Sequence, residues 1–170
     1  MSSTGSRSDR NGDTPPPEGV QAVVETLLAH PDPSRRKEAA VALGEIGDES
    51  VIPALARALG DPGKEVRAAA AGALASRGPP AVDVLIGSLG DANWVVRYRA
   101  AEALGFIREE RAVPTLIRVL GDSRDHVRYM AAKGLGRLGD RRAVGPLTAA
   151  LSDGNEFVRR AAREALASLG

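Results

Sequence analysis

The chain has 170 residues, a formal net charge of +1 at pH 7 and no cysteine, and it is 43% apolar but only 3% aromatic. The lack of cysteine excludes a disulfide framework and any site built from thiolates, and the near-neutral charge argues against a surface that binds nucleic acid throughout. Because no run of 18 apolar residues occurs and the first twenty residues hold no apolar segment, the sequence predicts a cytoplasmic protein without a membrane span or secretory signal.

The first 19 residues differ in composition from the rest of the chain. They are rich in Ser, Gly, Asp and Arg, contain a run of three prolines, and have no apolar residue after Met1. Such a segment cannot bury enough apolar surface to offset the entropy lost on ordering. We therefore expect a disordered N-terminal tail over residues 1–19. The alternative, a proline-rich recognition peptide, rests on the single PPP run.

Beyond residue 19 the sequence repeats itself. In five successive segments a leucine or valine is separated by eleven residues from an arginine, and neighbouring segments lie 30 or 31 residues apart. The predicted repeat domain spans 20–170, and its units are 20–50, 51–80, 81–111, 112–142 and 143–170. A fixed period of this length is typical of a solenoid, in which each unit packs against its neighbours.

Each unit contains two helical patterns. In the first, as in 113–120, apolar residues recur at i, i+3, i+4 and i+7, and proline stands near the start in three units. A Gly-Asp or Ser-Asp turn follows, and the second pattern, as in 96–107, has a single apolar stripe. No segment alternates as a half-buried strand would. The sequence therefore predicts an all-α fold, an α-solenoid of five stacked helix–turn–helix units.

The predicted core consists of small side chains. Alanine occurs 29 times, whereas Trp, Tyr and Phe together occur five times. An ordinary globular core uses aromatic side chains to fill volume. A core of Ala, Val and Leu indicates thin layers of helices in close approach.

The second helix carries a recurrent motif, Val-Arg-x-x-Ala-Ala-x-Ala-Leu. It stands at Val66–Leu74 and Val96–Leu104, and with Gly134 in place of an alanine at Val127–Leu135. This repeat resembles the HEAT family, in particular its short-repeat branch named after phycobilisome lyase. The resemblance implies that second helices line the concave face of the solenoid and hold partners there. The first unit departs with Arg35 in the valine place, and the fifth has Arg163 in the second alanine place.

One aspartate and one arginine recur in every turn of the solenoid. The aspartates follow the first helix and the arginines belong to the motif of the second: Asp61, Asp91, Asp122 and Asp153, with Arg67, Arg97, Arg128 and Arg159. Recurrence in every unit is what stacking demands, whereas a binding site usually differs between units. We interpret these residues as a structural ladder of ion pairs, as in the resembled family, rather than as phosphate ligands.

The positions of the second helix that do not recur point to a binding surface. All five aromatic residues fall outside the apolar stripe, and all belong to units three to five. Aromatic residues beside arginines are typical of protein interfaces, although some of these rings could instead cover helix ends. The predicted partner-binding residues are Trp94, Tyr98, Arg99, Glu102, Phe106, His126, Tyr129, Met130, Lys133, Arg137, Phe157 and Arg160.

These observations predict a non-catalytic module that binds a protein or peptide on the face of the second helices, with no catalytic residue, cofactor or metal site. The family resemblance leaves open a chromophore-handling subunit similar to phycobilin lyases. A deoxyhypusine hydroxylase-like enzyme fits less well, because His30 precedes Pro31 and His126 precedes Val127, so the paired His-Glu iron motifs are absent. Nucleic acid is an unlikely partner, since the excess basic residues of unit four are spread around that unit. Self-association through the C-terminal unit is a further possibility.

Overall fold

The computed structural model describes residues 17–170, which form ten α-helices and no strand. The first helices of the five units are α1 (Glu18–Ala29), α3 (Ile52–Ala58), α5 (Val82–Ser88), α7 (Val113–Val119) and α9 (Val144–Ala150). The second helices are α2 (Pro33–Ile46), α4 (Lys64–Arg77), α6 (Trp94–Ile107), α8 (Asp125–Leu138) and α10 (Glu156–Leu169). Short 3-10 helices precede the first helices of units two to five: η1 (Glu49–Val51), η2 (Pro79–Ala81), η3 (Glu110–Ala112) and η4 (Arg141–Ala143).

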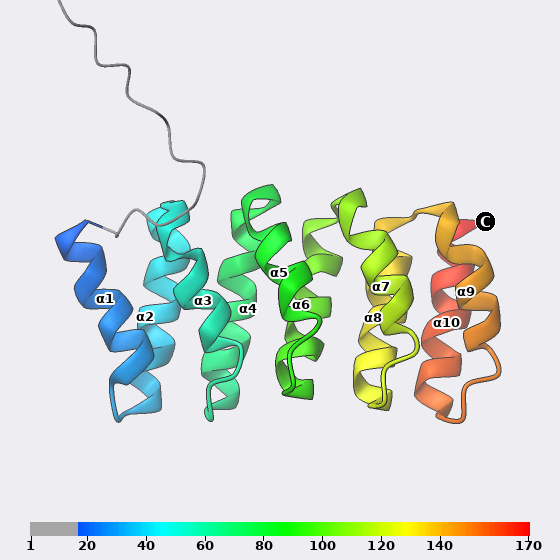
Figure 1. Cartoon of the computed structure of the whole chain (residues 1–170), viewed down its shortest axis with the longest axis horizontal. Helices are drawn as coiled ribbons and strands as arrows, with labels where there is room; N and C mark the ends of the chain where they lie inside the picture. The colour runs from blue at the N-terminus through cyan, green and yellow to red at the C-terminus, as the bar shows by residue number, and fades with distance from the viewer. Residues whose placement is uncertain (1–16) are drawn as a thin grey trace, which may run out of the picture.

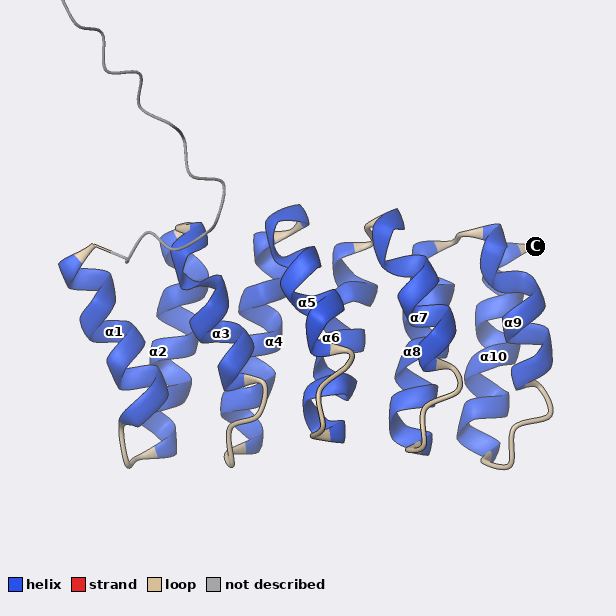
Figure 2. Cartoon of the chain, in the orientation of Figure 1, coloured by secondary structure: helices blue, strands red, loops and turns tan. Residues whose placement is uncertain are grey.

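The helices form two layers that run in chain order from one end of the molecule to the other. Figure 1 shows the first helices in front of the second helices, and Figure 2 shows that loops join them only at the two ends of the units. The predicted all-α solenoid of five helix–turn–helix units is therefore confirmed. None of the helices within 17–170 has the length and hydrophobicity needed to cross a membrane.

The predicted N-terminal tail lies outside the described residues as far as residue 16. Glu18 and Gly19, which that prediction also included, belong to α1. The helix begins there because the Pro17 carbonyl accepts hydrogen bonds from the N–H groups of Val20 and Gln21, and because an acidic residue in the first turn suits the helix dipole.

The core between the layers is made of leucine, valine and alanine. Leu55, Leu85, Leu116 and Leu147 recur at one position of the first helices and are completely buried. Among the described residues, no aromatic and no polar side chain is fully buried. The predicted core of small aliphatic residues is confirmed.

Glycine and alanine set the distance between second helices. A Cβ atom added to Gly105 of α6 would lie 2.9 Å from the Cα atom of Gly134 in α8. Similar close approaches join Gly44 of α2 to Ala73 of α4, and Gly136 of α8 to Ala165 of α10. At the α4–α6 contact the corresponding residue of α4 is Ala75, and these two helices contact each other less extensively than the other adjacent second helices.

The predicted ladder is present in three of its rungs. Arg36 donates two hydrogen bonds to Asp61, at 2.8 and 3.0 Å, Arg97 donates two to Asp122, and Arg128 donates two to Asp153. In each rung an arginine of one unit binds the turn of the next. The arginine also donates to backbone carbonyls of its own turn, so it fastens both units at once.

The rung between units two and three is missing. Arg67 donates to the carbonyls of Asp61 and Pro62, but its Nε atom is buried without a partner and it forms no ion pair with Asp91. Unit two is also one residue shorter than units one, three and four, and Gly78 alone joins α4 to η2 where the other connectors have two residues. Gly78 adopts φ 65° and ψ −138°, a conformation open only to glycine.

Candidate partner-binding face

Second helices of units three to five present side chains spaced three or four residues apart on one surface, which we call the aromatic face. Such spacing places residues in line along a helix. The face consists of Trp94, Tyr98, Glu102 and Phe106 of α6, His126, Tyr129, Lys133 and Arg137 of α8, and Phe157, Arg160 and Glu164 of α10. Phe106 and Phe157 are the most exposed large apolar residues among those described, at 57% and 60%.

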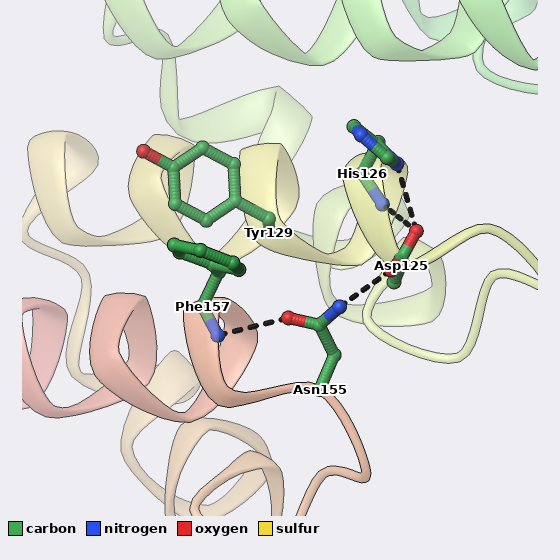
Figure 3. Close-up of a pocket in the computed structure, with 5 residues that line it drawn as sticks. All are labelled: Asp125, His126, Tyr129, Asn155 and Phe157. Atoms are coloured by element: carbon green, nitrogen blue, oxygen red, sulfur yellow. Dashed lines mark hydrogen bonds and ion pairs between the residues drawn. The ribbon is translucent and has the colours of Figure 1, made fainter.

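A hollow of about 360 Å³ lies where α8 and α10 begin. It is lined by Asp125, His126, Tyr129, Asn155 and Phe157, and Figure 3 shows Tyr129 and Phe157 on one side with His126 on the other. The Trp94 ring extends this aromatic surface onto α6, because its centroid lies 5.4 Å from that of His126.

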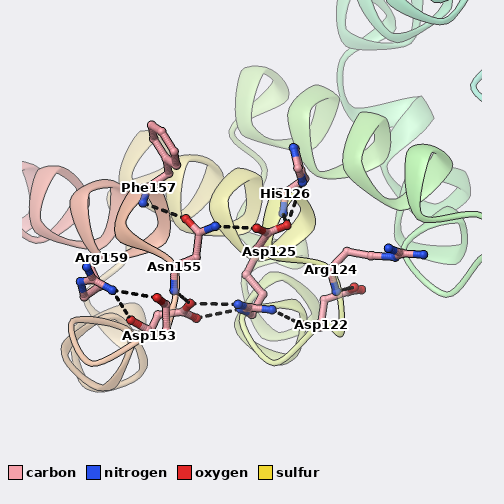
Figure 4. Close-up of polar contacts among 10 residues, drawn as sticks. Asp122, Arg124, Asp125, His126, Asp153, Asn155, Phe157 and Arg159 are labelled. Atoms are coloured by element: carbon pink, nitrogen blue, oxygen red, sulfur yellow. Dashed lines mark hydrogen bonds and ion pairs between the residues drawn. The ribbon is translucent and has the colours of Figure 1, made fainter.

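The polar rim of the hollow is held by a chain of hydrogen bonds. The Asn155 side chain caps α10 by accepting from the Phe157 N–H at 2.8 Å and donates to the Asp125 carboxylate. Asp125 Oδ1 accepts from the backbone N–H of His126 at 2.8 Å and lies 2.8 Å from its Nδ1 atom. These bonds to His126 hold the pKa of Asp125 below its usual value. Figure 4 shows that the network continues to Asp153 of the ladder, which fixes the rim to the scaffold.

Three cations lie over rings of the face, two from the face itself and Arg99 from beside it. The Arg137 guanidinium carbon is 4.2 Å from the Phe106 centroid, and Lys133 Nζ is 5.5 Å from the Tyr129 centroid. Arg99 lies 5.5 Å from the Tyr98 centroid and forms an ion pair with Glu102 at 2.6 Å. Burial, reinforced by the charge of Glu102, raises the pKa of Tyr98.

The prediction for Met130 is wrong. Its side chain is 5% exposed and belongs to the hydrophobic core, so it is inaccessible to a partner. It occupies the second position after Val-Arg, which faces the neighbouring second helix. Arg99, at the same position of unit three, is only 14% exposed and its guanidinium is already bound by Glu102.

The other predicted residues lie on the aromatic face, and their contribution to binding stays a prediction. Trp94, Tyr98 and Tyr129 are half-buried and pack against the edge of the core, so part of each ring covers the helices, as the alternative interpretation expected. Asp125 and Asn155 were not predicted. For Asn155 the sequence held a signal, because an asparagine directly before a helical segment is a typical N-cap residue.

No catalytic constellation is evident on this face. Among residues 17–170, no three side chains of His, Asp or Glu converge as metal ligands would. The one contact between a histidine and a carboxylate there joins neighbouring residues, His126 and Asp125, both on the open rim of the hollow. The arrangement offers rings, cations and hydrogen-bonding groups to a bound molecule.

Comparisons with known proteins agree with this architecture. A family model described as HEAT repeats matches residues 20–94 and 82–167. A search of curated proteins gives no significant match. Among solved structures, the complex of CpcE and CpcF of phycocyanin lyase from Nostoc sp. PCC7120 is similar with 26% identity and a TM-score of 0.66, covering 97% of this chain and 70% of that one.

Two further structures share the fold at lower identity. Human deoxyhypusine hydroxylase in complex with glycerol is 22% identical with a TM-score of 0.56, over 88% of this chain and 73% of that one. A designed armadillo repeat protein in complex with the peptide (KR)4 is 21% identical with a TM-score of 0.57, over 87% and 80% of the two chains.

Proposed function

Because the chain belongs to the HEAT-repeat family, we propose that it is a non-catalytic module that binds a protein or peptide on its aromatic face. The observation that carries this proposal is the placement of all five aromatic residues outside the core, on three adjacent second helices. Aromatic and arginine side chains supply most of the binding energy at protein interfaces. The rings of Phe106 and Phe157 are more than half exposed to water. Such exposure of apolar surface is unfavourable, and contact with a partner would remove it.

The rigidity of the scaffold supports the same proposal. The ladder and the close helix contacts hold the face in one conformation, so little entropy is lost when a partner binds. The solved neighbours include a complex of two protein subunits and a repeat protein in complex with a peptide, which is consistent with this mode of action. We place the protein in the cytoplasm, as the sequence predicts.

The test is an affinity capture from the source lysate with the wild type and the Phe106→Ala/Tyr129→Ala/Phe157→Ala variant. The matched control, Val41→Ala/Ile46→Ala, removes exposed apolar side chains from unit one. Circular dichroism must first show that both variants fold. We expect a partner that the wild type and the control retain and the aromatic variant loses. Equal capture by all three proteins would contradict the proposal.

A chromophore-handling subunit is the second candidate, and the similarity to phycocyanin lyase over 97% of the chain favours it. It predicts that the purified protein binds a linear tetrapyrrole in the hollow, with a shifted absorption band that Tyr129→Ala/Phe157→Ala abolishes. An unchanged spectrum on mixing would remove this candidate. The hydroxylase-like candidate has no supporting residue, because the His-Glu pairs are absent.

Self-association through the C-terminal unit also stays a prediction. Ala40, Ala71, Ala101 and Ala132 are buried against the following unit, whereas Arg163 at the same position of α10 is exposed. Stacking of a second copy on α10 would bury this charge. Light scattering of the wild type and Arg163→Ala tests the prediction, and a monomer in both at high concentration would contradict it.

A further inference from the structure

Two cations of the aromatic face, Lys133 and Arg137 of α8, form no ion pair with any of residues 17–170. The arginines on either side of them are matched within the chain, Arg99 by Glu102 at 2.6 Å and Arg160 by Glu164 at 2.8 Å. Among the residues of the aromatic face, the positive charge that no described carboxylate matches is therefore confined to α8, the central helix.

Both cations are held in place by rings. Arg137 lies against Phe106 and beside Gly105, and its Nη1 atom is buried with no hydrogen-bond partner among the described residues. Lys133 lies over Tyr129. A buried donor without an acceptor is unfavourable and rare in native proteins, so a group that supplies acceptors beside Arg137 would relieve it. A carboxylate suits this role because it accepts two hydrogen bonds from a guanidinium and carries the opposite charge.

The hollow beside Tyr129 supplies an apolar contact on the same helix. Its polar residues are hydrogen-bonded to one another, Asp125 to Asn155 and to His126, so the rings of Tyr129 and Phe157 are the apolar surface offered to a ligand side chain (Figure 3). Along α8, Lys133 follows Tyr129 by about 6 Å and Arg137 follows by about 12 Å, at 1.5 Å per residue.

We propose, on the basis of the proposed function, that the partner presents an acidic peptide to α8. One aromatic or large aliphatic side chain fills the hollow between Tyr129 and Phe157, and carboxylates two and four residues away bind Lys133 and Arg137. The spacing follows from an extended peptide, in which alternate side chains share one side and repeat every 6 to 7 Å or so. This repeat is close to the step of about 6 Å that separates Tyr129, Lys133 and Arg137 along α8.

The surrounding charges favour such a peptide over a nucleic acid. Carboxylates also belong to this surface, Glu102 of α6 and Glu164 of α10 on the face and Asp125 at the hollow. A phosphate backbone carries a charge at every nucleotide and would meet these carboxylates, whereas a peptide can place its carboxylates at the two cations alone. Charge complementarity of this kind fixes the register of a partner.

The test begins with selection of a random peptide library on the full chain. Selected peptides are then synthesised with their acidic residues intact or replaced by Gln or Lys, and titrated by fluorescence anisotropy against Lys133→Gln/Arg137→Gln. The matched control is Arg118→Gln/Arg141→Gln, which removes two exposed charges of the same unit, on α7 and η4, outside the second helices. A single-stranded oligonucleotide is titrated in parallel.

We expect selected peptides to carry an apolar anchor with Asp or Glu two and four residues away. Lys133→Gln/Arg137→Gln should weaken binding by about tenfold or more, and the control by about twofold or less. Added salt should weaken binding to the wild type. Neutral or basic peptides that Phe157→Ala no longer binds would overturn the inference and leave the proposed function standing. Selection of no peptide would overturn the inference, and the lysate capture described above then decides the proposed function by itself. Tighter binding of the oligonucleotide through Lys133 and Arg137 would replace the peptide with a nucleic acid.

Discussion

The arginines of the ladder each perform two tasks that depend on their planar, multiply donating side chain. Arg128 donates through Nη1 to the carbonyl of Asp122 in its own turn and through Nε and Nη2 to Asp153 of the next. A lysine could not form this geometry. Because the pair is largely covered, with side chains 19% and 11% exposed, removal of either member leaves a poorly solvated charge.

Replacement of Arg128 by Ala should lower the free energy of unfolding by about 2 kcal/mol, since Asp153 then lacks its charged partner. Binding to the aromatic face should change much less. Thermal and urea unfolding measure the effect. Arg67→Ala is the matched control, because Arg67 makes only the backbone contacts, and its cost should be smaller. An equal loss in both variants would show that the ladder carboxylates contribute nothing.

Stability should fall in acid because of the same pairs. Hydrogen bonding from Arg128 lowers the pKa of Asp153. For Asp61 and Asp122 burial is the largest single influence and would raise the pKa, but the hydrogen bonds from Arg36 and Arg97, the backbone N–H bonds and the neighbouring arginine charges together outweigh it and lower the pKa. A carboxyl whose pKa is lower in the folded state contributes stability above its unfolded pKa of about 3.9, and that contribution is lost as pH falls through the folded pKa. Melting midpoints measured from pH 6 down to about pH 2 should drop below about pH 4. Arg128→Ala should show a shallower drop, and parallel curves would contradict the assignment.

At the scale of helices, contacts between backbones set the spacing of the second layer. Gly44, Gly105 and Gly136 stand where the following helix comes within van der Waals contact, and Ala75 stands there in α4. A methyl group at this position holds α6 away from α4. The looser contact and the missing rung therefore occur at the same place in the molecule.

Gly105→Ala should destabilise the protein by about 1–3 kcal/mol, because its Cβ would meet the Gly134 backbone. This sign is opposite to the intrinsic preference, in which alanine stabilises a helix interior by about 1 kcal/mol relative to glycine. Gly72→Ala in α4 is the control, since no atom lies within 4 Å of the added Cβ, and it should stabilise the protein. Chemical denaturation compares the two, and a stabilised Gly105→Ala would contradict the close contact.

The helices and the core follow from the sequence because their causes are local and repeated. Leu55 and its counterparts recur at one position of the first helices, and each copy independently predicts that this position is buried. Met130 could not be placed in this way, since its burial depends on how near the neighbouring helix stands. Asn155, which caps α10 in unit five, donates to Asp125 of unit four, and no repeated sequence pattern marks this pair. The bond therefore becomes visible only in three dimensions. The sequence shows that the connector at Gly78 is one residue short. It does not show that Arg67 consequently fails to pair with Asp91.

For the whole molecule, stability is the sum of unit stabilities and the contacts between neighbouring units. The junction of units two and three lacks an ion pair and has the least extensive contact between second helices. This junction is therefore the least stable interface between units of the described chain. Unfolding should begin with separation of unit two from unit three.

Equilibrium unfolding should show this in two probes. Trp94, the single tryptophan, lies in α6 of unit three, so its fluorescence reports on the C-terminal units, while far-ultraviolet circular dichroism reports on all helices. We expect the dichroism signal to begin its loss at lower urea than the fluorescence. Coincident curves would indicate a single cooperative transition. Ala75→Gly, which permits closer approach of α4 and α6, should bring the two curves together.

The position of Gly78 and Arg67 has a consequence for how the protein can vary. Every ring of the aromatic face lies on the C-terminal side of this junction. Units one and two can consequently change their tilt, or detach for a time, while the rings and cations of α6, α8 and α10 keep their mutual distances. The N-terminal segment is thus free to acquire a different curvature or a second partner without disturbing recognition at the first.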